Sequence, residues 1–189
     1  MRLNLGCGYN KPEGWFSVDS SPACEPDLVL DLNQTPWPWE TNTVSEVMMH
    51  HSLEHMGETT ERFLAIMCEL YRVCKDEARI SLRVPHPRHD AFICDPTHVR
   101  IITPATLDLF NRHMNDRWIR EHKSNTPLAH YLGVDFRVLE TLKELDEPYA
   151  TQFNECTLSE DALTLLEKER NNVILEYKIT LEVRKDADF

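Results

Sequence analysis

The feature that most constrains the fold is a short apolar run near the N-terminus that ends in two closely spaced glycines. Residues 2–5 predict a buried strand, and Gly6, Cys7 and Gly8 follow it in a chain with only five glycines. Glycine lacks a Cβ atom and adopts positive φ without strain, so such a turn lets a ligand lie against the backbone. We therefore expect a sharp turn that borders a binding site, although Gly-x-Gly alone occurs in many turns.

Short apolar runs that end in polar residues recur along the first half of the chain. Further strands are predicted over 15–19, 27–32, 44–49 and 79–84. Apolar residues with a helical period predict a helix over about 60–74. Thr103 followed by Pro104 predicts the start of another helix, which reaches about Asn111 or beyond.

The last third of the chain predicts one helix and two strands. Residues 134–138 alternate apolar and polar side chains, and residues 173–183 do so over eleven positions. Thr157 with Glu160 fits a capping box for a helix that continues to Arg170. Because no linker or repeat divides the sequence, we expect one domain over residues 1–189.

Strands that alternate with loops or helices predict an α/β fold with a mostly parallel sheet and a late hairpin at one edge. Ligands bind such sheets beyond the carboxyl ends of the strands. The glycines, acids and histidines of this chain gather at those ends: Gly6, Gly8, Asp19, Asp31, His50, His51, His86 and His89.

Two aspartates at strand ends suggest a nucleoside site. Asp19 can accept hydrogen bonds from both hydroxyls of a ribose, and Asp31 can accept one from the exocyclic amine of an adenine. The backbone N–H of Leu32 would then meet a ring nitrogen. The alternative is that both aspartates only form turns, which is common at strand ends.

Composition limits the partners of the chain. Its net charge of −12 disfavours bulk nucleic acid and anionic membranes. No apolar run approaches the roughly 20 residues of a membrane span, and the N-terminus does not resemble a signal peptide. Six scattered cysteines without a CxxC pair predict a cytoplasmic protein with reduced thiols. Residues 83–123 hold seven Lys and Arg against five Asp and Glu, so a polar or anionic substrate is best tolerated there.

An ordered series of motifs over residues 1–110 resembles the class I S-adenosylmethionine-dependent methyltransferases of the small type 11 kind. The series is LNLGCG, Val-Asp at 18–19, DLNxxPxP from 31, HSLEH from 51 and LYRVCK from 70. The resemblance implies a doubly wound, three-layer Rossmann-like fold with a seven-stranded sheet. Its implied strand order is 3-2-1-4-5-7-6, with strand 7 antiparallel.

The resemblance also implies a cofactor and its contacts. S-adenosylmethionine would be held by Gly6, Cys7, Gly8, Asp19, Asp31, Leu32 and His50. In this chain the first crossover offers only residues 7–14, and a parallel connection normally needs a dozen or more. The first helix is therefore expected to be one turn at most. Trp37 and Trp39 either cover the adenine or belong to the core.

Methyl transfer from a sulfonium is an in-line displacement in which the protein supplies alignment and, for some acceptors, a base. The side chains expected beside the methyl position are His51, Asp95, His98 and Arg100, with His86 and His89 as further candidates. The acceptor is expected to be a small molecule, which the sequence does not identify.

Two other functions compete with methyl transfer. His51, Glu54 and His55 match the H-x-x-E-H signature of zinc metallohydrolases, but that site needs a helix and here the motif follows a strand and precedes Gly57. The chain could also bind the cofactor without catalysis, as a regulatory module. On the methyltransferase hypothesis no metal site is expected.

Overall fold

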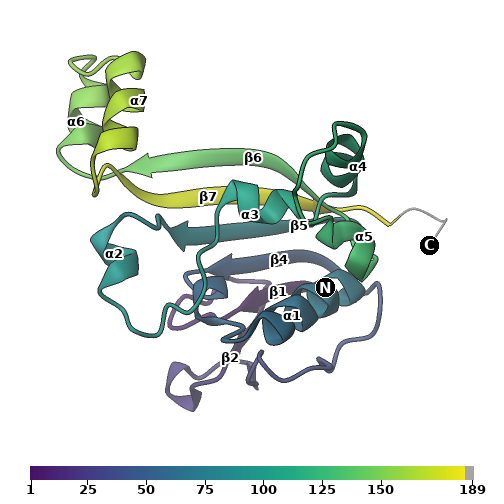
Figure 1. Cartoon of the computed structure of the whole chain (residues 1–189). Helices are drawn as coiled ribbons and strands as arrows, with labels where there is room; N and C mark the ends of the chain where they lie inside the picture. The colour runs from purple at the N-terminus through teal and green to yellow at the C-terminus, as the bar shows by residue number, and fades with distance from the viewer. Residues whose placement is uncertain (186–189) are drawn as a thin grey trace.

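A computed structural model describes residues 1–185 and contains one seven-stranded sheet (Figure 1). The strands are β1 (Arg2–Leu5), β2 (Phe16–Asp19), β3 (Leu28–Val29), β4 (Val44–His50), β5 (Cys74–Pro85), β6 (Phe136–Leu145) and β7 (Ile174–Val183). Their order is β3-β2-β1-β4-β5-β7-β6. The first five are parallel, and β7 is antiparallel to β5 and β6. The predicted strand order is therefore confirmed.

Most helices follow β4 in the chain. They are α1 (Thr60–Val73), α2 (Asp90–Ile93), α3 (Pro104–Asp108), α4 (Arg112–Arg120), α5 (Leu128–Leu132), α6 (Tyr149–Asn154) and α7 (Glu160–Glu169), with the 3-10 turns η1 (Pro22–Cys24) and η2 (Leu53–His55). None of the helices in residues 1–185 has the length and apolar character that crossing a membrane would require.

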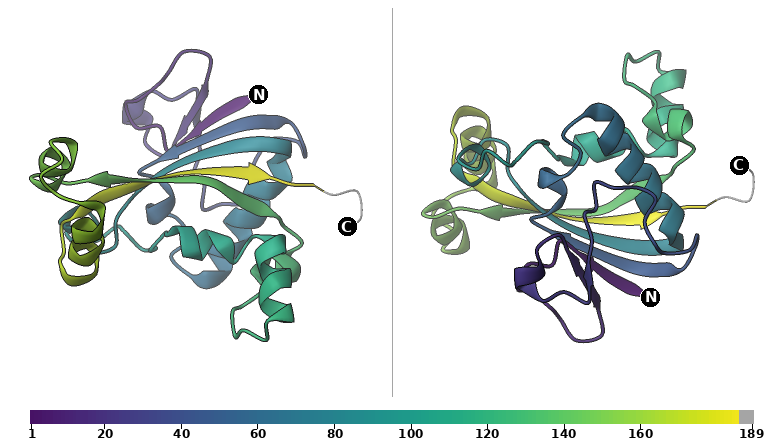
Figure 2. Two further views of the ribbon diagram at one scale, coloured as in Figure 1. Left: turned by 90° about the horizontal axis from the view of Figure 1, so that it is seen from above. Right: turned by 90° about the horizontal axis from the view of Figure 1, so that it is seen from below.

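One face of the sheet is apolar and lies under the helices. Strand register aligns Leu3 with Val47, Val47 with Ile80, and Ile80 with Leu181, so these side chains share one face. All four are at most 1% exposed. In both views of Figure 2, α1, α3, α4 and α5 lie on one side of the sheet. The core is thus formed between one sheet face and one layer of helices.

The neighbouring row of side chains lies on the opposite face and is largely polar. Asn4 pairs with Met48, Met48 with Ser81, and Ser81 with Thr180. Within the described chain this face is covered mainly by the connection from β1 to β3, on the side opposite the long helices (Figure 2). No helix joins β1 to β2, as the short crossover predicted, and η1 is the only helical turn before β4. The second helical layer of a doubly wound fold is therefore reduced to loop and η1.

Element boundaries differ from the predictions where side chains cap the backbone. α3 ends at Asp108, and the side chain of Asn111 accepts a hydrogen bond from the N–H of Met114, so α4 begins as a separate helix after Asn111. Ser159, not Thr157, is the N-cap of α7. The Thr157 hydroxyl instead donates to the Gln152 carbonyl at 3.0 Å.

Three strands also differ in length from the predictions. The third strand shrinks to Leu28–Val29, because residues 31–34 form a turn in which the N–H of Gln34 donates to the Asp31 carbonyl. The fifth starts at Cys74, directly after α1, and the sixth extends to Leu145 by pairing along β7. These differences leave the sheet order unchanged.

The glycine turn after β1 is closed by contacts with β2 and with the loop after β4. The N–H groups of Gly6 and Cys7 both donate to the Val18 carbonyl, at 2.9 and 3.0 Å. Gly6 has φ +72°, and a Cβ atom there would lie 2.4 Å from the Cβ of Ser52. The Ser52 hydroxyl donates to the Leu5 carbonyl at 2.8 Å. The end of β1 and the loop after β4 are therefore in direct contact.

A buried carboxylate fixes the loop before β4. Glu69 of α1 accepts a hydrogen bond from the Trp37 N–H at 2.6 Å and is paired with Arg72. The Arg72 guanidinium also donates to the carbonyls of Trp37 and Trp39. Both tryptophans belong to the core, at 3% and 8% exposure, and neither lines the cofactor-sized cavity described below. The core interpretation of these two residues is correct, and the adenine-lid interpretation is wrong.

Replacing Glu69 by Gln should lower the free energy of unfolding by about 2 kcal/mol at neutral pH, because charged hydrogen bonds are lost in a buried site. The hydrogen bonds from Arg72 hold the pKa of Glu69 below its ordinary value of 4.5. The stabilisation of the fold by ionised Glu69 is therefore fully present above pH 4.5 and is lost as pH falls through the lowered pKa.

Urea denaturation of Glu69→Gln and of the unmodified chain, at pH 7 and at pH 3.5, measures the difference in their free energies of unfolding. The matched control is Glu58→Gln, because Glu58 is 76% exposed and should change stability by less than about 0.5 kcal/mol. Equal stability of Glu69→Gln and the unmodified chain at pH 7 would contradict the role assigned to Glu69.

Replacing Gly6 by Ala should destabilise the chain more than replacing Gly8 by Ala. Both glycines have positive φ, but a Cβ at Gly8 meets nothing within 4 Å, whereas at Gly6 it meets Ser52. Steric overlap of this kind adds about 1–3 kcal/mol to the backbone strain. Thermal denaturation of both variants provides the comparison, and equal melting temperatures would show that the Ser52 contact does not constrain the turn.

Candidate functional site

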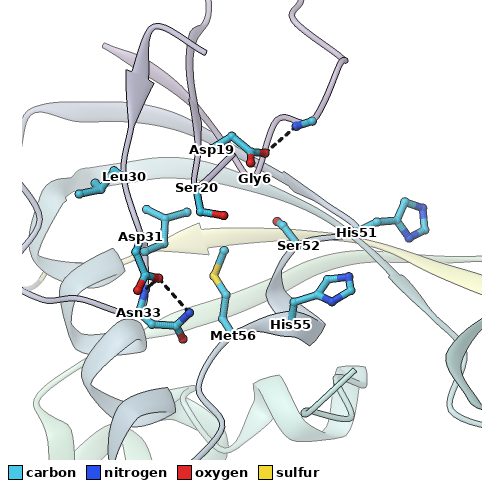
Figure 3. Close-up of a pocket in the computed structure, with 12 residues that line it drawn as sticks. Gly6, Asp19, Ser20, Leu30, Asp31, Asn33, His51, Ser52, His55 and Met56 are labelled. Atoms are coloured by element: carbon cyan, nitrogen blue, oxygen red, sulfur yellow. Dashed lines mark hydrogen bonds between the residues drawn. The ribbon is translucent and has the colours of Figure 1, made fainter. Parts of the chain in front are cut away.

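A cavity of about 340 Å³ lies at the carboxyl ends of the first four strands (Figure 3). Four chain segments contribute to its wall, one after each of β1, β2, β3 and β4. The lining residues are Gly6, Gly8, Asp19, Ser20, Leu30, Asp31, Leu32, Asn33, His51, Ser52, His55 and Met56. The strand order reverses between β1 and β4, so the cavity lies where doubly wound sheets bind ligands.

Asp19 connects the glycine turn to the end of β2. Its Oδ2 accepts a hydrogen bond from the Gly8 N–H at 2.8 Å, and its Oδ1 accepts one from the Ser21 N–H at 2.9 Å. A carboxylate offers about four lone pairs, so each oxygen can accept a further bond. Beside it, Gly8 has φ +50° and open space where a Cβ would lie. Both features allow close approach of a hydroxylated ligand.

Asp31 lies across the cavity from the glycine turn (Figure 3). Its Oδ1 accepts hydrogen bonds from the backbone and side-chain amides of Asn33, at 3.0 and 3.1 Å. The Asn33 backbone N–H is the main cause that holds the pKa of Asp31 below its ordinary value. The carboxylate is therefore ionised at neutral pH. Apolar walls are supplied beside it by Leu30, Leu32 and Met56.

A second cavity of about 480 Å³ adjoins the loop after β4. Titratable side chains from three segments line it, together with Pro85, Ala91 and Leu175: they are His51, Glu54, His55, Asp95, His98 and Glu176. His51 and His55 line both cavities. The second cavity therefore lies beside the β4 end of the first.

His51 is held between two acids at this junction. Its Nε2 lies 2.9 Å from Oε2 of Glu176, and its Nδ1 lies 3.6 Å from Oε1 of Glu54. The contact with Glu54, followed by the charge of Glu176, raises the pKa of His51 above its ordinary value. Its side chain is 53% exposed, so it can contact a ligand in either cavity.

The H-x-x-E-H motif does not form a helical zinc site. His51 has φ +54°, in the left-handed region, and η2 begins only at Leu53. The imidazoles of His51 and His55 are therefore not one turn apart on a common helix, and the metallohydrolase arrangement is absent.

Cys7 and His50, two of the seven predicted cofactor contacts, do not line the first cavity. The Cys7 side chain is buried, which raises the pKa of its thiol. The ring of His50 lies on the polar sheet face, with Nε2 3.0 Å from the Ser81 hydroxyl. Its partial burial lowers the pKa to about 4, so the ring is neutral at pH 7.

Of the four predicted catalytic residues, His51, Asp95 and His98 line the second cavity and Arg100 lines neither cavity. The guanidinium of Arg100 donates to the Gly57 carbonyl at 2.6 Å and lies over the ring of Phe63. Its surroundings are those of a structural residue. His89 also lines neither cavity and pairs with Asp146 at 2.9 Å.

Sequence analysis missed Glu176 as a site residue. It is 5% exposed and reaches the site from β7, more than one hundred residues after His51 and His55. No local signal marked it, because Glu176 lies on the same sheet face as the polar residues Lys178 and Thr180 and so matches the polar positions of the alternating strand. Glu54 was noticed only as part of the H-x-x-E-H motif.

Comparisons with known proteins give a match in structure but not in sequence. No protein family model matches the chain, and no curated protein matches it. A SAM-dependent methyltransferase from Archaeoglobus fulgidus matches with a TM-score of 0.57 at 21% identity, covering 96% of this chain and 85% of that one.

Two further solved structures extend the comparison. A protein from Sulfolobus solfataricus described as a type 11 methyltransferase has a TM-score of 0.51 at 11% identity, covering 100% of this chain and 86% of that one. The [4+2]-cyclase SpnF has a TM-score of 0.54 at 15% identity, covering 98% and 75%. At these identities the likeness establishes the fold alone. The chain therefore has the fold of class I S-adenosylmethionine-dependent methyltransferases, the one that the sequence motifs implied.

Proposed function

We propose that this protein is an S-adenosylmethionine-dependent methyltransferase that acts on a small polar molecule. The observation that carries the proposal is the convergence of Gly8, Asp19 and Asp31 on one cavity at the strand-order reversal. The sequence alone predicts a binding role for each of these three residues. Gly-rich turns and strand-end acids are the groups that a nucleoside with a charged tail requires.

The residues around the first cavity fit the cofactor. Asp19 keeps acceptor capacity toward a ribose, and the open side of Gly8 allows close approach to the backbone. Asp31 and Leu32 would hold the adenine, the first through its carboxylate and the second through its backbone. Tyr9, directly after Gly8, is 82% exposed and does not narrow the turn.

When bound, the cofactor supplies an electrophilic methyl group on a sulfonium, and the chain supplies position. His51 borders both cavities and is the side chain best placed to orient an acceptor between them. Its contacts with Glu54 and Glu176 fix the direction of the ring. Asp95 and His98 complete the wall of the second cavity, where we place the acceptor.

Isothermal titration calorimetry tests cofactor binding. S-adenosylmethionine and its demethylated product should each bind with a stoichiometry of one, and Asp19→Ala should weaken binding by about 10- to 100-fold, the worth of charged hydrogen bonds. Asp116→Ala is the control, because Asp116 is exposed and pairs with His130 away from both cavities. Absence of binding heat and of a thermal shift with both ligands would refute the proposal.

Transfer of a labelled methyl group tests catalysis. Label from S-adenosylmethionine should appear in the small-molecule fraction of a cell extract, and His51→Ala should lower this transfer by about 100-fold while changing cofactor affinity less. His113→Ala is the control. Cofactor binding without transfer to any fraction would favour a non-catalytic module, and label in protein or nucleic acid would contradict the small-molecule acceptor.

A further inference from the structure

We propose that Glu54, His55 and His98 form a binding site for a divalent transition-metal ion of the Zn²⁺ class. One donor atom from each of these side chains lies within 4.8 Å of the others. Two imidazoles and one carboxylate are a ligand set that suits zinc and its neighbours in the first transition row. On the methyltransferase hypothesis no metal was expected.

The buried carboxylate of Glu54 points to a missing positive charge. Glu54 is 1% exposed, and neither carboxylate oxygen accepts a hydrogen bond from the described residues. The ion pair that it makes is with His51, whose Nδ1 lies 3.6 Å from Oε1, too far for a hydrogen bond. Buried carboxylates are normally paired or bound to a metal, because an unsolvated charge is costly.

The hydrogen bonds of His98 leave one ring nitrogen free to bind a metal. Nδ1 lies 2.9 Å from the carbonyl oxygen of Phe92, which can only accept, so Nδ1 carries the proton. In the neutral ring Nε2 therefore has the lone pair, and its nearest carboxylate oxygen, Oδ2 of Asp95, lies 3.9 Å away, too far for a hydrogen bond. The ring also stacks on that of Phe92, with centroids 5.2 Å apart. This is the pattern of a metal-binding histidine, whose other nitrogen donates to a carbonyl or carboxylate.

His55 also donates from Nδ1, in its case to the hydroxyl oxygen of Thr97. The Thr97 hydroxyl donates its single proton to Oδ1 of Asp95 at 2.6 Å. It must therefore accept at its contact with Nδ1 of His55, which is 2.9 Å long. His55 thus carries its proton on Nδ1 and has a lone pair on Nε2. Asp95 and Thr97 act as positioning residues for this ring.

These tautomers leave one lone pair on each imidazole, and ligand atoms of both rings and of the Glu54 carboxylate lie within 4.8 Å of one another. A cation that accepts electron pairs satisfies all three at once. Mg²⁺ and Ca²⁺ prefer oxygen ligands only, so they fit this set less well. Three protein ligands leave at least one coordination position open, as in catalytic rather than structural zinc sites.

The location gives the metal a further role that rests on the proposed methyl transfer. All three ligands line the second cavity, and His55 also lines the first. An open coordination position would therefore face the space assigned to the acceptor. A metal there favours acceptors whose nucleophilic atom is an anionic oxygen or a thiolate.

Metal titration of the full chain tests the site without any cofactor, so its outcome is independent of the methyltransferase proposal. The background variant carries Cys94→Ser and Cys156→Ser, which removes the two exposed thiols. After chelator treatment, Zn²⁺ should bind with a stoichiometry of one in calorimetry, and Co²⁺ should give visible absorption of a low-coordinate site. Mg²⁺ should produce neither signal.

Single variants assign the ligands. Glu54→Gln and His98→Gln should each weaken Zn²⁺ binding by more than about 100-fold. This loss exceeds the one expected when a residue that only hydrogen-bonds a metal ligand is removed. Thr97→Val should weaken it by about 10- to 100-fold, and Thr97→Ser should restore it. His113→Gln, in α4, is the matched control.

Metal-free thermal denaturation separates loss of the site from loss of the fold, and Co²⁺ spectra of the Thr97 variants report the ligand geometry even where stability changes. Zn²⁺ affinity that is unchanged in both Glu54→Gln and His98→Gln would overturn the proposal. Absence of one-to-one Zn²⁺ binding by the background variant would overturn it as well.

Discussion

The contact between Gly6 and Ser52 is the constraint on which both cavities depend. It joins the end of β1 to the loop after β4 so closely that no side chain fits between them. The hydrogen bond from Ser52 to the Leu5 carbonyl holds the same two segments together. Gly8 and Asp19 follow on one side of this contact, and His51 and Glu54 on the other. The first and the second cavity are therefore neighbours, because the end of β1 and the loop after β4 are in contact.

The one-sided covering of the sheet explains several features at once. Since no long helix joins β1, β2 and β3, one sheet face is covered by loop and η1 in place of a helical layer, and its strands alternate apolar and polar residues. Rows such as Leu3–Val47–Ile80 and Asn4–Met48–Ser81 show this alternation across the parallel part of the sheet. It also explains His50: as the last residue of β4 it shares the face of Ser81, so its ring turns away from the cavity.

Features that follow from local sequence patterns were predicted correctly. Contacts between residues far apart in the sequence were not. Strand order and the positions of Asp19 and Asp31 followed from motifs, because strand ends in a parallel sheet meet at one edge. Cys7 and His50 were assigned to the cofactor by motif position alone, and neither residue lines the first cavity. Glu176 arrives from β7, whose register with β5 no local pattern specifies. The lone pairs of His55 and His98 likewise depend on the contacts of Thr97 and Phe92.

Charge at the second cavity links its two proposed roles. The cations of residues 83–123 do not line it: Arg88 donates to the Lys168 carbonyl, and Arg100 donates to the Gly57 carbonyl. Three acids line the cavity instead, and no Lys or Arg does so within the described chain. Without a bound cation, this lining favours a neutral or positively charged acceptor. A divalent ion on Glu54 would offset two of these three negative charges and would accept an anionic donor atom of the acceptor directly. The charge of the preferred acceptor therefore depends on whether a metal ion is bound at this site.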